Sequence, residues 1–298
     1  MKETNQQDTV ASLSLKAPAK INLFLKILRR RPDGYHEIES LMQKIELFDT
    51  LHFFREGESI ALSCPDTDLP EDEGNLVYRA AQAFCFFTGI KAGVKIVLEK
   101  KIPIAAGLGG GSSDAAAAVL GLNRLFETGL DQNRLSEIAG PLGADVEFFV
   151  RDCSAALASG IGDHIQKVES PAEYTVVLVN PGFGVSTKWA YENFPLTSNS
   201  NPYILARDQN MSRILQGSFP GICETLGNDL EAVTVKRYSE IADIKKELKE
   251  AGAAVSLMSG SGPTVFGLFL TEDVAQRCYR QLSKKYSPNL FLARPYIP

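Results

Sequence analysis

Residues 103–113, with the sequence PIAAGLGGGSS, carry the strongest chemical signal in the chain. Four of the five residues from Gly107 to Gly111 are glycines, which leave backbone N–H groups unshielded and allow conformations closed to other residues. We expect a helix to start near Ser112. The loop donors and the positive end of the helix dipole would then bind an anion, with phosphate as the natural ligand. The alternative is a tight strand-to-helix connection, but such a connection needs only about one or two glycines.

The loop matches none of the common phosphate-binding motifs. No Gly-Lys-Ser/Thr ends it, as a Walker A loop requires, and Ser112 occupies the third glycine position of a dinucleotide fingerprint that starts at Gly107. The HRD and DFG segments of protein kinases are absent from the sequence. Ser112 and Ser113 could cap the helix or reach phosphate and Mg²⁺. Asp114, in the first helical turn, would repel phosphate unless its side chain points away or approaches the metal.

Composition favours small ligands over nucleic acid. The chain has 298 residues with 31 Lys and Arg against 36 Asp and Glu, so its formal net charge is −5. This balance disfavours nucleic-acid binding, which needs a basic face, but it allows a local anion site. No apolar run reaches about 18 residues, so we expect no membrane span. The densest basic run, Arg29–Arg31, could attract a diphosphate, although a solvated strand end is the simpler interpretation.

Cysteines and histidines form no metal or redox motif. The five cysteines are far apart, no pair has a two-residue spacing, and the three histidines lack metal-ligand spacing. We interpret the cysteines as buried free thiols in a reducing compartment. Residues 1–10 are polar and lack an apolar signal core, so we expect a cytoplasmic protein with a frayed tail over residues 1–11.

Hydrophobic periodicity predicts the elements that position the loop. Alternating β-prone segments predict strands at 12–28 (broken at Pro18), 41–55, 59–63, 93–100, 174–179, 254–258 and 264–270. Helical spacing predicts helices over 75–89, from 112, at 131–139, around 241–248 and at 272–284. Residues 195–221, rich in Pro, Ser, Asn and Gly, predict an irregular loop region with a short helix. The mixture of elements is typical of an α+β fold with a domain boundary near 165–173.

Three segments together resemble the GHMP kinases, a family of small-molecule kinases. The glycine loop reads P-x-x-x-G-L-G-G-G-S-S-D-A-A, and two further family motifs occur in the expected order, APAKINL at 17–23 and SGSGPTVF at 259–266. The resemblance runs from about residue 15 to residue 270. It implies a two-domain α+β fold. The N-terminal, ATP-binding domain at 12–168 would resemble domain 2 of ribosomal protein S5, and the C-terminal domain at 169–298 would be ferredoxin-like.

Additional motifs narrow the resemblance within the family. KINLFL at 20–25, RPDGYHE at 31–37 and GADV at 143–146 resemble the members that phosphorylate the 2-hydroxyl of 4-diphosphocytidyl-2-C-methyl-D-erythritol. That substrate is a cytidine diphosphate ester of the non-mevalonate isoprenoid pathway. The resemblance implies ATP as phosphoryl donor, with Mg²⁺. The chain departs from the family at Glu147, where proline usually follows GADV. A homoserine- or mevalonate-type kinase and a non-catalytic nucleotide-binding relative are the alternatives.

The resemblance also implies roles for individual residues. Asp145 would accept the hydroxyl proton, and Lys20 would be its charged partner; a helix cap and a solvated lysine are the ordinary interpretations of such residues. The residues implied to hold ATP are Pro103, Ala106, Gly107, Leu108, Gly109, Gly110, Gly111, Ser112, Ser113, Asn75, Leu76 and Lys101. The residues implied to hold the cytidine ester are Asn22, Tyr35, His36, Phe183 and Thr187.

Several of these residues have an alternative structural interpretation. Asn75 could equally be a plain helix N-cap, and the Tyr35 ring could pack under its own turn instead of stacking on cytosine. The Gly260–Gly262 turn would support the substrate side or a domain contact, or would only join two strands. Ser113 is the candidate contact to Mg²⁺. We expect a monomer or a weak homodimer.

Overall fold

The computed structural model describes residues 12–170, 173–195 and 226–297, and it groups the chain into two compact units that interleave in sequence. The first unit holds residues up to 17 with 49–100 and 111–150, and the second holds 18–48, 101–110 and the rest from 151. The family domains expected at 12–168 and 169–298 stay predictions. The expected tail at 1–11 and the loop region 195–221, apart from Pro195, lie outside the described residues.

The first unit packs helices on a small sheet. In this unit β4 (Val94–Glu99) pairs antiparallel with the end of β2 (His36–Phe54) and parallel with β3 (Ile60–Ser63). Its helices are α1 (Leu76–Thr88), α2 (Gly110–Leu125), α3 (Gln132–Ala139), the short 3₁₀ turn η1 (Gly140–Leu142) and α4 (Ala144–Val150). Gly121 lets α2 approach the sheet closely, because a Cβ there would lie 2.3 Å from the Phe53 ring.

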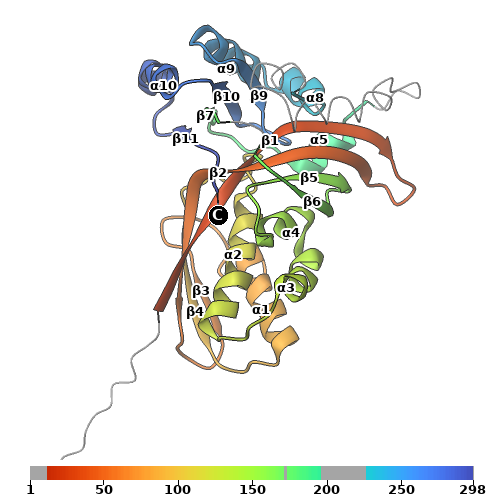
Figure 1. The fold of residues 1–298 in the computed structure, drawn as a ribbon, viewed down its shortest axis with the longest axis vertical. Helices are drawn as coiled ribbons and strands as arrows, with labels where there is room; N and C mark the ends of the chain where they lie inside the picture. The colour runs from red at the N-terminus through yellow and green to blue at the C-terminus, as the bar shows by residue number, and fades with distance from the viewer. Residues whose placement is uncertain (1–11, 171–172, 196–225, 298) are drawn as a thin grey trace, which may run out of the picture. The chain divides into compact units, whose positions relative to one another are not determined.

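The second unit contains an antiparallel sheet that is covered on both faces. Its strands lie in the order β11 (Leu290–Ala293), β7 (Thr175–Val179), β10 (Val265–Phe269) and β9 (Val255–Met258). Helices α9 (Glu240–Glu250) and α10 (Glu272–Tyr286) pack on one face (Figure 1). Val177 and Val179 belong to the core cluster on the helix side, whereas Val176 and Leu178 belong to a cluster that includes β1 residues.

A second sheet is built on the long hairpin of β1 (Ser12–Arg30) and β2, and the larger part of that hairpin belongs to this unit (Figure 1). The remaining elements are β5 (Ala155–Gly160), β6 (His164–Val168), α5 (Thr187–Glu192), β8 (Gly227–Asn228) and α8 (Glu231–Arg237). β5 pairs with β2 and β6, and β8 pairs in parallel with β1. Among the described residues, the chain has no helix with the length and apolarity that crossing a membrane requires.

The predicted break of the first strand at Pro18 is wrong, because β1 runs through it. The reason is the direction of the missing N–H. Residues two apart in a strand point their N–H groups to the same side, and the Lys20 N–H leaves the ladder to donate to the Leu108 carbonyl at 2.9 Å. Proline at residue 18 therefore removes no donor from the pairing of β1 with β2.

Most predicted helices are confirmed, with small shifts at their ends. Helix α1 ends at Gly89, whose φ of 72° is left-handed, as the predicted stop requires. Helix α2 begins at Gly110, two residues before the expected start at Ser112. The four cysteines within the described residues, Cys64, Cys85, Cys153 and Cys278, are free thiols. The fifth, Cys223, lies outside the described residues.

Lys44 is an unusual buried charge on β2. Its side chain is 3% exposed, and its Nζ donates to the Arg151 carbonyl at 2.8 Å. Burial lowers the pKa of Lys44 to about 8, because removal from water disfavours the ammonium. The neighbouring Cys153 and Asp152 oppose this shift but do not cancel it.

Lys44 gives the folded chain a predicted pH dependence. Between about pH 8 and pH 10.5 the unfolded chain binds a proton that the folded chain does not, so stability rises with pH in that window. From about pH 7.5 to about 9.5 we expect the unfolding free energy of the parent to rise by roughly 1 to 2 kcal/mol relative to Lys44→Met. Urea unfolding at both pH values measures this. Lys246→Met, which removes an exposed lysine on α9 that does not act on Lys44, controls for net charge. If the difference in unfolding free energy between the parent and Lys44→Met stays constant or falls over this pH range, Lys44 is charged inside the fold.

Candidate active site

Within the second unit, the glycine loop contacts the turn at residues 259–262, and only glycine permits this close contact. Gly107 has a φ of 77°, and a Cβ on it would lie 2.0 Å from the Ser259 carbonyl oxygen. The Ser259 hydroxyl donates to the Gly107 carbonyl at 2.9 Å. Leu108, the one larger side chain among residues 107–111, is 1% exposed and packs in the core cluster that contains Phe266. The loop is therefore anchored by an apolar side chain, while its glycines leave the backbone accessible.

The three segments that carry the family resemblance meet at this turn. The Asn22 N–H donates to the Ser259 hydroxyl at 3.3 Å, and the Lys20 N–H donates to the Leu108 carbonyl. The Thr264 N–H donates to the Ala106 carbonyl at 3.3 Å. Strand β1, the glycine loop and the segment after β9 are thus joined by main-chain and hydroxyl hydrogen bonds. The turn therefore connects β9 to β10 and also joins β1 to the glycine loop.

Lys20 lies buried beside this turn and is oriented by Asn22. Lys20 is 5% exposed, and its Nζ donates to the Asn22 Oδ1 at 2.6 Å. The amide of Asn22 donates in turn to the Ser40 hydroxyl at 2.8 Å, which fixes which atom of Asn22 faces Lys20. A Cβ at Gly260 would lie 3.4 Å from the Lys20 Nζ, so the turn backs directly onto the ammonium. Lys20 is not a solvated strand lysine.

Asp145 belongs to the first unit, where it is the second residue of α4 and is half-buried. Gly143, with a φ of 155°, precedes the helix, and the Val146 N–H donates to the Gly143 carbonyl at 3.0 Å. Helix α4 runs through Glu147, so the departure from the family sequence leaves the helix intact. The pairing of Asp145 with Lys20 and its role as proton acceptor stay predictions.

Tyr35 and His36 line a pocket of about 600 Å³ in the second unit. The pocket is lined by Arg30, Asp33, Gly34, Tyr35, His36, Ile38, Ile161, Thr187, Lys188, Tyr191 and Glu192. The Tyr191 ring stacks on His36 with 5.5 Å between ring centroids and 29° between planes. The Thr187 Oγ1 lies 3.0 Å from the Ser261 Oγ, which links this pocket to the turn beside Lys20.

The polar groups of this pocket suit recognition of a flat, polar ring. Tyr35 is 61% exposed, so its ring does not pack under its own turn. Partial burial, and then the positive charge of Arg30, lower the pKa of His36, which favours the neutral imidazole. A neutral imidazole can both donate and accept hydrogen bonds at the edge of a base. Of the arginine run, Arg29 pairs with Glu37 and Arg31 with Asp33, while Arg30 lines the pocket.

Phe183 lies apart from the pocket lining, and Tyr191 lies in it. The Phe183 ring stacks on Tyr238 with 4.7 Å between centroids. Sequence reasoning missed Tyr191, although a signal was present. Tyr191 follows Thr187 by four residues in the same helix, so the two side chains share a face of α5. The predicted contact of Phe183 with substrate stays a prediction.

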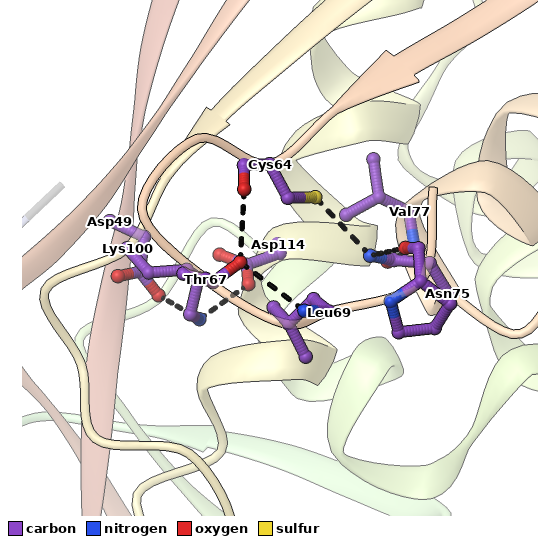
Figure 2. A network of polar contacts seen from close by, with 9 residues as sticks. Asp49, Cys64, Thr67, Leu69, Asn75, Val77, Lys100 and Asp114 are labelled. Carbon is purple, nitrogen blue, oxygen red and sulfur yellow. Dashed lines mark hydrogen bonds and ion pairs between the residues drawn. The ribbon is translucent and has the colours of Figure 1, made fainter. Parts of the chain in front are cut away.

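The predicted nucleotide residues of the first unit begin two helices. Asn75 is the N-cap of α1, since its Oδ1 accepts from the Val77 N–H at 2.9 Å (Figure 2). Its amide donates to the Pro70 carbonyl. Leu76 is the first residue of that helix. Ser113 is 1% exposed, and its hydroxyl has no hydrogen-bond partner among the described residues. Approach of Asn75 to adenine, and contacts of Pro103 or Lys101 with ATP, stay predictions.

A buried ion cluster lies next to Ser113 and was missed by sequence reasoning. Lys100 donates to Asp49 at 2.5 Å and to Asp114 at 2.7 Å (Figure 2). Burial, together with the Asp49 charge, raises the pKa of Asp114 to about 7 although Lys100 opposes the shift. The pKa of Lys100 is raised, because the two carboxylates outweigh its burial. Asp114 therefore points its carboxylate at Lys100, which removes the conflict expected between an acidic residue and the loop predicted to bind phosphate.

Comparison with known proteins places the chain in a family. The model of the GHMP kinases N terminal domain matches residues 75–160, and that of the GHMP kinases C terminal domain matches residues 211–288. The 4-diphosphocytidyl-2-C-methyl-D-erythritol kinase of Geotalea daltonii is 44% identical over 92% of this chain and 95% of its own length.

Two solved structures share the fold over nearly the whole chain. A crystal structure of 4-(cytidine 5'-diphospho)-2C-methyl-D-erythritol kinase has a TM-score of 0.78 at 32% identity, covering 95% of this chain and 98% of that one. The homoserine kinase of Cytophaga hutchinsonii has a TM-score of 0.76 at 21% identity, covering 100% and 98%. The second likeness is one of fold alone.

The contact between Gly107 and Ser259 predicts a large effect of a single methyl group. We expect Gly107→Ala to lose roughly 2 kcal/mol or more of unfolding free energy, because the Cβ meets a main-chain oxygen and a left-handed φ is strained for alanine. Gly111→Ala is the matched control, since a Cβ there meets no described atom within 4 Å. Urea unfolding compares the two variants. Equal stability of Gly107→Ala and the parent would contradict the close approach.

Proposed function

The chain belongs to the GHMP kinase family, and we propose that it transfers the γ-phosphoryl group of ATP to the 2-hydroxyl of 4-diphosphocytidyl-2-C-methyl-D-erythritol, giving the 2-phosphate and ADP. The chain is then an ATP-dependent small-molecule kinase of isoprenoid precursor synthesis. The relative of 44% identity and the crystal structure of 32% identity both carry the name of this enzyme, and each is matched over more than nine-tenths of its length.

One observation carries the choice of substrate. The pocket with Tyr35 and His36 offers an exposed ring, a stacked ring pair with Tyr191 and a neutral imidazole, which together suit a cytosine base. Homoserine and mevalonate have no aromatic ring for such a pocket. The likeness to homoserine kinase, at 21% identity, supports the shared fold and does not favour homoserine as the substrate.

The chain's own residues would position ATP and the accepting hydroxyl. Backbone N–H groups of the glycine loop and of the start of α2 would bind the phosphates without a full positive charge. The buried ammonium of Lys20, oriented by Asn22, would stabilise the charge that develops on the transferring group. Asp145 would accept the hydroxyl proton as the oxygen attacks the γ-phosphorus and ADP departs.

Mg²⁺ would arrive with ATP and neutralise charge on its phosphates. Among the described residues, no group of three or more His, Cys, Asp or Glu side chains forms a metal-binding cluster. The hydroxyl of Ser113, at the start of α2, has no hydrogen-bond partner in the described part of the chain and fits a contact to such an ion. We further propose that the chain is cytoplasmic, acts as a monomer or weak homodimer, and does not act on nucleic acid.

A substrate panel tests the proposed function. With ATP and Mg²⁺ we expect ADP release to depend on 4-diphosphocytidyl-2-C-methyl-D-erythritol. Homoserine and mevalonate should give a kcat/KM lower by about a thousandfold or more, because they lack the base that fills the pocket. A coupled ADP assay measures all three. Turnover with homoserine or mevalonate that equals or exceeds turnover with the cytidine ester would contradict the proposal. ATP binding without any product would favour a non-catalytic relative.

A pair of aromatic substitutions tests how the cytosine is held. Tyr191→Ala should raise KM for the cytidine ester about tenfold and leave KM for ATP unchanged, since base stacking on one aromatic ring contributes about 1 to 3 kcal/mol. Phe183→Ala is the comparison that decides between the two rings, because the Phe183 ring stacks on Tyr238 rather than lining the pocket. The assignment fails if Phe183→Ala raises KM for the ester and Tyr191→Ala does not.

A further inference from the structure

The buried cluster around Lys100 lies at the two ends of the glycine loop. Lys100 follows β4 and is the last residue before the segment 101–113, and Asp114 follows that segment on α2. The two residues are fourteen positions apart in sequence, and the Lys100 Nζ donates to the Asp114 Oδ2 at 2.7 Å. Figure 2 shows the two side chains pointing at each other, with Asp49 on the other side of the ammonium. This hydrogen bond therefore joins the two ends of the segment, whose interior is also bonded at Gly107 and Leu108.

Asp49 fixes this closure to the sheet. It lies on β2 next to Thr50, which pairs with Glu99, the residue before Lys100. The side chains of Lys100, Asp49 and Asp114 are 7%, 0% and 2% exposed, so water and salt screen their attraction little. Ion pairs of this kind are costly to break on one side, because the partner is left as an uncompensated buried charge. The contact is thus a firm attachment rather than a surface ion pair.

A glycine-rich segment needs such an attachment more than an ordinary loop does. Glycines have the largest conformational freedom of all residues, and fixing that freedom opposes binding. Joining the ends of a segment lowers the number of conformations that its interior can adopt. A loop that binds phosphate through backbone N–H groups gains affinity when those groups are already aligned. The contact between Lys100 and Asp114 supplies this constraint.

We propose that Lys100 and Asp114 form a clamp across the phosphate-binding loop, and that both are positioning residues for ATP. Neither is a catalytic residue, because each acts through the loop whose ends it holds. The proposal gives Asp114 a role that the sequence pattern alone presents as a conflict, a carboxylate beside a phosphate site. The effect expected on ATP binding rests on the proposed function, whereas the clamp itself can be tested without any turnover.

Substitutions at Asp114 test the clamp more safely than removal of Lys100, which would leave two buried carboxylates without a cation. Asp114→Leu has a similar size and no acceptor, and it leaves the neutral pair of Lys100 with Asp49 in place. Asp114→Asn, the matched control, keeps an oxygen that can accept from Lys100. We expect Asp114→Leu to raise KM for ATP about tenfold, to leave KM for the cytidine ester unchanged and to lower kcat by less than KM rises. Asp114→Asn should stay within about twofold of the parent.

Amide hydrogen exchange supplies a readout that does not depend on catalysis. In the ATP-free protein, residues 103–113 should exchange faster in Asp114→Leu than in the parent, while the amides of β7 and β10 in the second unit keep their protection. Asp114→Asn should match the parent in both regions. Unchanged exchange over 103–113 in Asp114→Leu, or equal effects of the two substitutions, would overturn the clamp. If the parent shows no turnover with ATP, the proposed function fails, and the exchange result still decides whether the clamp exists.

Discussion

The approach of the Ser259 carbonyl to Gly107 is the constraint on which the arrangement of the second unit's site depends. It brings two backbones closer than any side chain would allow. Around it the Ser259 hydroxyl joins the loop to β1, and Gly260 backs onto Lys20. Segments 152 and 237 residues apart in sequence are held in one place by hydrogen bonds that use main-chain groups and one hydroxyl. These contacts explain how segments so distant in sequence come to lie together.

The distribution of charge explains how an acidic chain can act on polyanions. The formal net charge is −5, yet both proposed substrates carry phosphates. Two lysines beside the loop are buried and oriented, Lys20 by Asn22 and Lys100 by carboxylates. Most of the donors proposed for the phosphates are uncharged N–H groups, which a count of ionisable residues does not register. The count still disfavours a broad basic surface, and with it nucleic acid as a substrate.

The parts of this structure that depend on local signals could be predicted from the sequence, and the parts that depend on distant contacts could not. Helix α1 has an N-cap, an apolar stripe and a glycine stop, and it forms as expected. The continuity of β1 through Pro18 depends on where one N–H would point, which the sequence does not reveal. Strand β5, with the sequence AALASG, has little β-propensity of its own and forms by pairing with β2. Lys100 carried no signal, because its partners lie on β2 and α2.

We propose that these buried contacts serve one reaction, phosphoryl transfer to the 2-hydroxyl of a cytidine diphosphate ester. Phosphorus NMR of the product formed from ATP and 4-diphosphocytidyl-2-C-methyl-D-erythritol tests this directly. We expect one new phosphomonoester resonance, coupled to the carbon at position 2, together with one ADP for each ester formed. A phosphate on a different hydroxyl, or ADP and free phosphate without a new ester, would contradict it.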